Sequence, residues 1–82
     1  MAAGRRALQA ARTNPAGVSF ADLKRLVAAA GFVLARREGS HHVYKKAGVA
    51  EIVNVQPRGR MAKPYQVRQV VGLIDKYRMT VE

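Results

Sequence analysis

The sequence FVLARREGSHHVYK fills residues 32–45 and predicts a β-hairpin. Phe32 to Arg37 has the composition of a strand, Glu38-Gly39-Ser40 that of a tight turn, and His41 to Lys45 that of the antiparallel partner. A third strand is predicted at Glu51 to Gln56, which contains three β-branched residues and is followed by a proline. Together these segments predict an antiparallel meander.

Helices are predicted on both sides of this meander in the sequence. Ser19 is placed as an N-cap, so a helix should begin at Phe20, and Gly31 should end it in a left-handed conformation. Pro64 fits the first position of a final helix that ends near Tyr77. The segment from Arg58 to Lys63 is predicted to be a basic loop.

The order of these elements predicts the α+β fold class, with a three-stranded antiparallel sheet packed on helices. Residues 1–82 are expected to form a single domain. Within it, residues 1–15 are an N-terminal helical extension, and residues 18–78 form an α-β-β-β-α core that matches the outline of a double-stranded RNA-binding domain (dsRBD). Element order alone gives no warrant for a function.

Composition excludes several classes of protein. The chain has no cysteine, which excludes a disulfide framework, thiolate zinc ligands and a thiol nucleophile. No apolar run approaches the roughly 20 residues needed to span a bilayer. We therefore expect a soluble, cytoplasmic protein with no membrane partner.

Charge points to an anionic partner. The chain carries 15 Lys and Arg residues against five Asp and Glu residues, which gives a net charge of +10. The excess is uneven, because residues 36–68 hold eight cations and only two acids, Glu38 and Glu51. Self-repulsion on this scale does not stabilise a compact chain, so we expect the positive surface to receive a polyanion.

Both histidines lie in the run Gly39-Ser40-His41-His42, within this basic region. A near-neutral proton acceptor among cations suits the phosphodiester backbone of a nucleic acid. Cleavage of RNA needs a base for the 2′-hydroxyl proton, an acid for the leaving oxygen and cations for the charge that develops on phosphorus. Successive strand residues point to opposite faces, so one histidine should act alone and His42 is expected to be a packing residue.

The donor of the second proton is left open between water and a tyrosine such as Tyr44. The five acids are scattered, with no close pair for a two-metal nuclease, and two adjacent histidines without a third ligand make a poor zinc site. No phosphate-binding glycine-rich loop has the required spacing. We therefore expect no metal site and no small-molecule cofactor.

Two alternatives to catalysis follow from the same charge. The chain could be a non-catalytic, small basic RNA-binding module, because phosphate neutralisation needs only the cations. It could also be an interaction protein whose positive face receives an acidic partner. If removal of one imidazole abolishes the activity on RNA, catalysis is favoured. If substitution of many Lys and Arg residues each weakens that activity a little, the RNA-binding module is favoured, and absence of RNA affinity favours the interaction protein.

Several segments resemble the HicA family of toxin endoribonucleases. They are Phe20-Ala21-Asp22-Leu23, Ala30-Gly31-Phe32 and residues 37–44, while Asn14-Pro15, Asn54-Val55-Gln56 and residues 63–67 resemble a longer subgroup of that family. The resemblance implies a dsRBD-like toxin of a type II toxin-antitoxin system, which cleaves messenger RNA (an mRNA interferase) and is silenced by a HicB-type antitoxin. The catalytic histidine of the family follows Gly-Ser, which implies His41 here.

RNA is expected to be bound by the turn beside His41 and by the cations of the neighbouring strands and loop. These residues are Gly39, Ser40, Arg36, Arg37, Lys45, Lys46, Arg58, Arg60 and Lys63.

Overall fold

The structure is a computed structural model that describes residues 3–82, and it confirms the predicted α+β fold class. Residues 1 and 2 of the predicted extension lie outside the described residues. The elements are α1 (Ala3–Thr13), the 3₁₀ turn η1 (Pro15–Gly17), α2 (Phe20–Ala29), β1 (Val33–Glu38), β2 (His41–Lys45), β3 (Val53–Val55), β4 (Pro57–Arg58), β5 (Met61–Ala62) and α3 (Pro64–Lys76).

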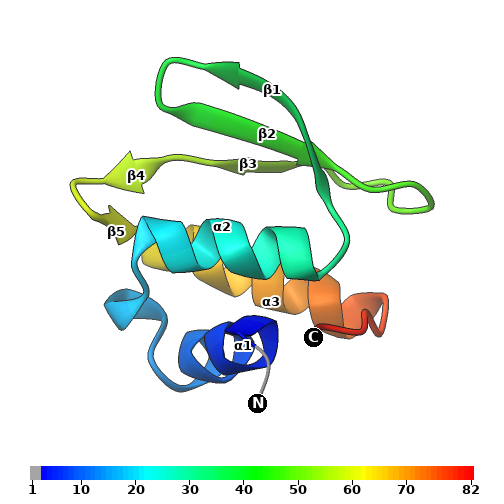
Figure 1. Cartoon of the computed structure of the whole chain (residues 1–82), viewed down its shortest axis with the longest axis horizontal. Coiled ribbons are helices and arrows are strands. Elements are labelled where there is room, and N and C mark those ends of the chain that lie inside the picture. The colour runs from blue at the N-terminus through cyan, green and yellow to red at the C-terminus, as the bar shows by residue number, and fades with distance from the viewer. Residues whose placement is uncertain (1–2) are drawn as a thin grey trace.

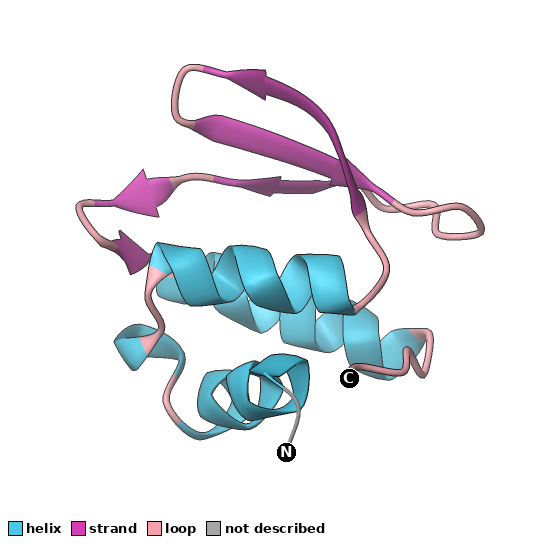
Figure 2. Cartoon of the chain, viewed as in Figure 1, coloured by secondary structure: helices cyan, strands magenta, loops and turns pink. Residues whose placement is uncertain are grey.

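The elements form layers (Figure 1). Strands β1, β2 and β3 make one antiparallel sheet in that order, with β2 in the centre. Helices α2 and α3 lie side by side under one face of this sheet, and α1 packs against both helices from below. The opposite face of the sheet is covered by no helix of the described chain (Figure 2). We call it the open face.

The helix boundaries follow from local sequence signals. The Ser19 hydroxyl accepts a hydrogen bond from the Asp22 backbone N–H at 3.1 Å, which confirms the predicted N-cap of α2. Gly31 ends this helix with φ +98°, a conformation that favours glycine. Pro64 is the first residue of α3, as predicted. None of the described helices is long and apolar enough to cross a membrane.

The core lies between the inner face of the sheet and the two central helices. Its largest fully buried side chains are Leu23, Leu26, Val27, Val55, Val67 and Val70. From α1, Ala7 and Ala11 join the same cluster, so the N-terminal helix is part of the packed structure. Small side chains on this face allow α1 to approach α2 and α3 closely.

Strand β1 contains a bulge that the sequence did not predict. Leu34 pairs with Tyr44, but the next pair is Arg36 with Val43, so Ala35 is an extra residue. The extra residue reverses the alternation of faces in the rest of β1. As a result Arg36 shares the open face with Val43, where unbroken pairing would have put it on the inner face.

Two predicted segments differ in the structure. The third strand covers only Val53–Val55, which is shorter than the predicted Glu51–Gln56. The predicted loop over Arg58–Lys63 is wrong, because β4 and β5 pair there as a small second hairpin. Its position depends on distant residues: the Ala62 N–H donates to the Val18 carbonyl at 2.9 Å. A prediction from local composition does not include such contacts.

Candidate active site

The turn between β1 and β2 is short and held by its own residues. Glu38 pairs with His41 at the end of the ladder, and Gly39 and Ser40 form the turn between them. Gly39 has φ +57°, a left-handed conformation that explains the glycine. The Arg37 Nε donates to the Gly39 carbonyl oxygen at 3.3 Å. The start of β2 is therefore fixed relative to β1.

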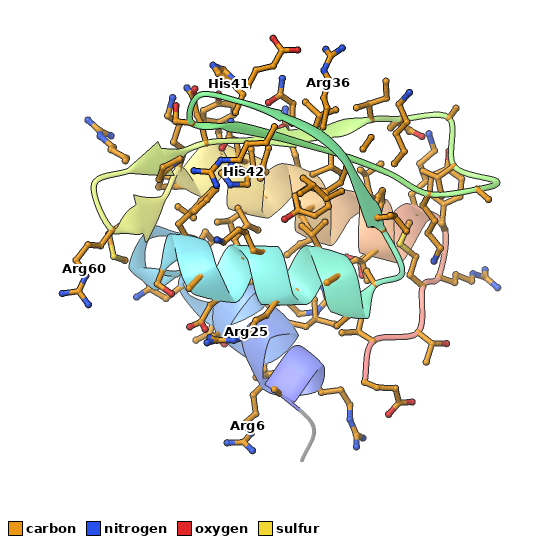
Figure 3. The ribbon with its side chains drawn as sticks, turned by 45° about the horizontal axis from the view of Figure 1, so that its top comes forward. Arg6, Arg25, Arg36, His41, His42 and Arg60 are labelled. Carbon is orange, nitrogen blue, oxygen red and sulfur yellow. The ribbon has the colours of Figure 1, made fainter. Side chains whose placement is uncertain are left out.

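His41 and His42 point to opposite faces of the sheet, as predicted (Figure 3). His42 is only 7% exposed, and its ring packs edge-on against Phe20 with the centroids 5.1 Å apart. Its Nδ1 lies 3.1 Å from the Ser40 carbonyl oxygen, which can only accept, so Nδ1 carries a hydrogen. His42 is thus a packing residue that also holds the turn.

His41 is exposed on the open face and contacts the neighbouring strand. Its Nδ1 lies 3.3 Å from the Asn54 Oδ1 on β3. An amide oxygen accepts and does not donate, so Nδ1 of a neutral His41 ring carries the hydrogen and Nε2 keeps its lone pair. The ring nitrogen that can take a proton is therefore Nε2.

Sequence reasoning did not assign a role to Asn54. A local signal was present, because Asn54 stands between two valines in a strand and alternation places it on the face opposite theirs. Its contact with His41 depends on the register between β2 and β3, in which Asn54 pairs with Val43. That register is set by packing across the sheet and is not apparent in the local sequence.

One carboxylate lies opposite His41 on the open face. Glu38 on β1 pairs with His41 in the ladder, and its Oε1 lies 3.1 Å from the Nε of Arg36. Both side chains of this ion pair are well exposed. Arg36 and Glu38 are two residues apart in β1 and therefore share a face, and the bulge at Ala35 makes that face the open one.

The suggestion that Tyr44 donates the second proton is wrong. Tyr44 is buried on the inner face of β2, where it belongs to the hydrophobic core, so the sheet separates it from His41. Burial also raises the pKa of the Tyr44 hydroxyl. Tyr44 is therefore not placed to donate a proton on the open face.

The predicted RNA-binding cations fall into three groups. The first comprises Arg36 and Lys45, which line a hollow of about 430 Å³ on the open face together with Ala35, Val43, Ile52 and Asn54. Because Asn54 also contacts His41, this hollow adjoins the imidazole. Two cations and an apolar floor therefore lie next to the candidate base.

The second group belongs to the β4–β5 hairpin and the start of α3. Arg58 and Arg60 are exposed, and Lys63 precedes α3 and is partly buried. Figure 1 places the β4–β5 turn and the β1–β2 turn at the same end of the molecule, and Figure 3 shows Arg60 pointing outward there. These cations therefore lie at the same end of the molecule as the β1–β2 turn that precedes His41.

The third group comprises Lys46, which lies away from His41, and Arg37, which contacts the β1–β2 turn. The Lys46 Nζ donates to the Ala30 carbonyl at 2.6 Å and thereby caps the end of α2. Lys46 follows the end of β2 that is farthest from His41. Arg37 pairs with His42 in the ladder and donates to Gly39. The structure thus gives both residues a structural contact.

Comparison with known proteins identifies the family. A family model described as the HicA toxin of bacterial toxin-antitoxin systems matches residues 20–75, which is more than half of the chain. The chain belongs to the HicA toxin family. Searches of curated proteins and of solved structures found no match. Membership implies a cognate antitoxin as partner, and the matched range runs from the first residue of α2 into α3 without α1.

Proposed function

We propose that this HicA-family toxin is a metal-independent endoribonuclease, an mRNA interferase, in which His41 is the general base. The observation that supports this most is the exposed imidazole whose Nδ1 is engaged by Asn54, because Nε2 is then free to accept a proton. The open face around it has room for an RNA strand, since no described helix covers it.

The proposed step is an attack within the RNA. Nε2 of His41 removes the proton from a ribose 2′-hydroxyl, and that oxygen attacks the adjacent phosphorus. The bond from phosphorus to the 5′ oxygen of the next nucleotide breaks, and this oxygen takes a proton from water. The products are a 2′,3′-cyclic phosphate and a 5′-hydroxyl, while His41 is left protonated and returns its proton to solvent.

Cations near His41 would stabilise the charge that develops on phosphorus. Arg36 and Lys45 flank the adjoining hollow, and Gly39 and Ser40 present backbone beside the imidazole without a bulky side chain. Arg58, Arg60 and Lys63 would hold the strand farther along, at the same end of the molecule. The contributions of Arg58, Arg60 and Lys63 to RNA binding should be individually small and additive.

We also propose that a HicB-type antitoxin silences the toxin by covering the open face. An acidic partner suits a surface where cations exceed acids, and once seated it would repel RNA. Partner and RNA should then compete, and added salt should slow the association steeply.

Competition is measured with a fluorescent RNA that carries 2′-O-methyl groups and so cannot be cleaved. Lys45→Glu and Arg60→Glu should each weaken RNA and antitoxin together, whereas Arg5→Glu on the exposed side of α1 should weaken neither. A ternary complex of toxin, RNA and antitoxin with unchanged affinities would rule out occlusion.

The cleavage proposal is tested through the product ends. Purified toxin is incubated with a labelled RNA in excess chelator, and the fragments are analysed by mass spectrometry. We expect cleavage to persist and to leave cyclic-phosphate or 3′-phosphate ends. A requirement for magnesium, or fragments with 3′-hydroxyl ends, would contradict the proposal.

A further inference from the structure

We infer that Asn54 is a positioning residue for His41: its amide holds the imidazole in the tautomer and orientation in which Nε2 accepts the proton. The expected effect of Asn54 on RNA cleavage rests on the proposed function, but the geometry that supports the inference is independent of RNA. It assigns to β3 a part in a reaction whose base lies on β2.

The first support is the fixed position of Asn54. Its neighbours Val53 and Val55 are 5% and 1% exposed, so both are anchored in the core. Alternation then points the Asn54 side chain to the open face, beside β2. Because Asn54 pairs with Val43, it lies diagonally across from His41, and its Oδ1 reaches Nδ1 at 3.3 Å.

The second support is the chemistry of a neutral partner. An imidazole without a partner exchanges between two tautomers, and only the one with hydrogen on Nδ1 presents Nε2 as a base. An amide oxygen that accepts from Nδ1 favours this tautomer without adding charge. A carboxylate in the same place would also stabilise the charged ring and so raise the pKa of the imidazole. The base would then become active only at a higher pH.

The charged groups around His41 leave this role to Asn54. From β1, Glu38 lies opposite His41 but is engaged by Arg36. From β2 itself, Lys45 lies farther along the open face, and α2 and α3 pack on the other face of the sheet. Among the described residues, Asn54 is the side chain that makes a hydrogen bond to the His41 ring.

The test that does not depend on cleavage is NMR of the imidazole nitrogens. Long-range proton–nitrogen spectra of the folded toxin report which nitrogen carries hydrogen. We expect His41 in the Nδ1–H tautomer in the natural sequence and a shift toward Nε2–H in Asn54→Ala. His42 serves as the internal control, because its Nδ1 faces the Ser40 carbonyl in both proteins. A His41 ring with hydrogen on Nε2 in the natural sequence would overturn the inference.

The test of the consequence is the pH profile of single-turnover cleavage, from about pH 5 to about pH 9. Asn54→Ala should lower the plateau rate on the order of tenfold with unchanged RNA affinity. Asn54→Asp should restore much of the plateau but move the acidic limb upward by about one pH unit. Gln69→Ala, which removes an exposed amide from α3, should match the natural sequence.

Three outcomes separate the inference from the proposed function. If the natural sequence does not cleave RNA, the proposed function fails, while the NMR result still decides the role of Asn54. If Asn54→Ala cleaves with the natural rate and profile, the inference is wrong and the function stands. If Asn54→Ala and Asn54→Asp weaken RNA binding equally with no change of profile, Asn54 is an RNA contact and the inference is again wrong.

Discussion

Two adjacent histidines have different environments because they are neighbours in a strand. Alternation along β2 places His41 on the open face and His42 against Phe20. The same rule places Tyr44 in the core and removes it from the reaction. At the scale of single residues, the face on which a side chain lies therefore decides which groups are available for chemistry.

His42→Ala should destabilise the toxin without removing its activity. The change leaves a cavity beside Phe20 and removes the donor to the Ser40 carbonyl, so we expect a loss of about 2–4 kcal/mol in the free energy of unfolding. Urea denaturation measures this loss. Cleavage per folded molecule should be retained, and a loss of cleavage larger than the loss of folded protein would show that His42 takes part in the reaction.

At the scale of elements, the sequence predicted what local signals encode. The N-cap at Ser19, the stop at Gly31 and the turn at Gly39 lie within a few residues of the structure that they specify. These signals were sufficient to predict α2 and the β1–β2 hairpin, and Pro64 marked the start of α3. The fold class followed from their order, and the structure confirms it.

Features that depend on distant residues were missed. The bulge at Ala35, the β4–β5 hairpin and the contact between Asn54 and His41 arise from pairing between segments, which local composition does not determine. Lys46 illustrates the same limit, because its contact with Ala30 depends on where β2 ends relative to α2. The face on which His41 lies could thus be predicted from sequence, but its hydrogen-bond partner could not.

The docking of α1 is a separate prediction at this scale. Ala11 is 1% exposed against the other helices, so Ala11→Glu would bury an unpaired charge and should displace α1. Ala10→Glu, at the exposed neighbouring position, is the matched control. Thermal unfolding should show a clearly lower midpoint for Ala11→Glu and little change for Ala10→Glu. Equal midpoints would contradict the packing of α1.

Glu51 joins the segment before β3 to the end of α3 and should make stability depend on pH. Hydrogen bonds from Lys76 and then from Tyr77 lower the pKa of Glu51 from 4.5 to about 2. A pKa that is lower in the folded state means that the stabilisation is complete above about pH 4.5 and is lost as the pH falls toward about 2.

The measurement is the free energy of unfolding across this pH range. Glu51→Gln should remove part of the acid-induced loss, Lys76→Met should remove most of the same part, and Tyr77→Phe should remove less. Because Lys76 is exposed and Glu51 is partly exposed, added salt should reduce the effect. An identical acid profile for Glu51→Gln and the natural sequence would contradict the assignment.

At the scale of the whole molecule, ion pairs neutralise some cations of the described residues and leave others without an acidic partner. Asp75 pairs with Arg12, Asp22 with Arg25, and Glu51 with Lys76, so three of the five acids neutralise cations on or beside the helices. Within the described residues, no acidic side chain forms an ion pair with Lys45, Arg58 or Arg60. These three cations of the two hairpins therefore keep their full charge, and the proposed function requires an RNA strand to pass near them.

The most direct test of this account is RNA cleavage by His41→Ala. The exposed ring contributes little packing, so the variant should fold as well as the natural sequence and lose ~100-fold to ~10,000-fold in cleavage rate. Rates are measured with one labelled RNA at matched folded fraction, beside His42→Ala. The account predicts the loss at His41 alone. Undiminished cleavage by His41→Ala, or an equal loss per folded molecule in His42→Ala, would contradict it.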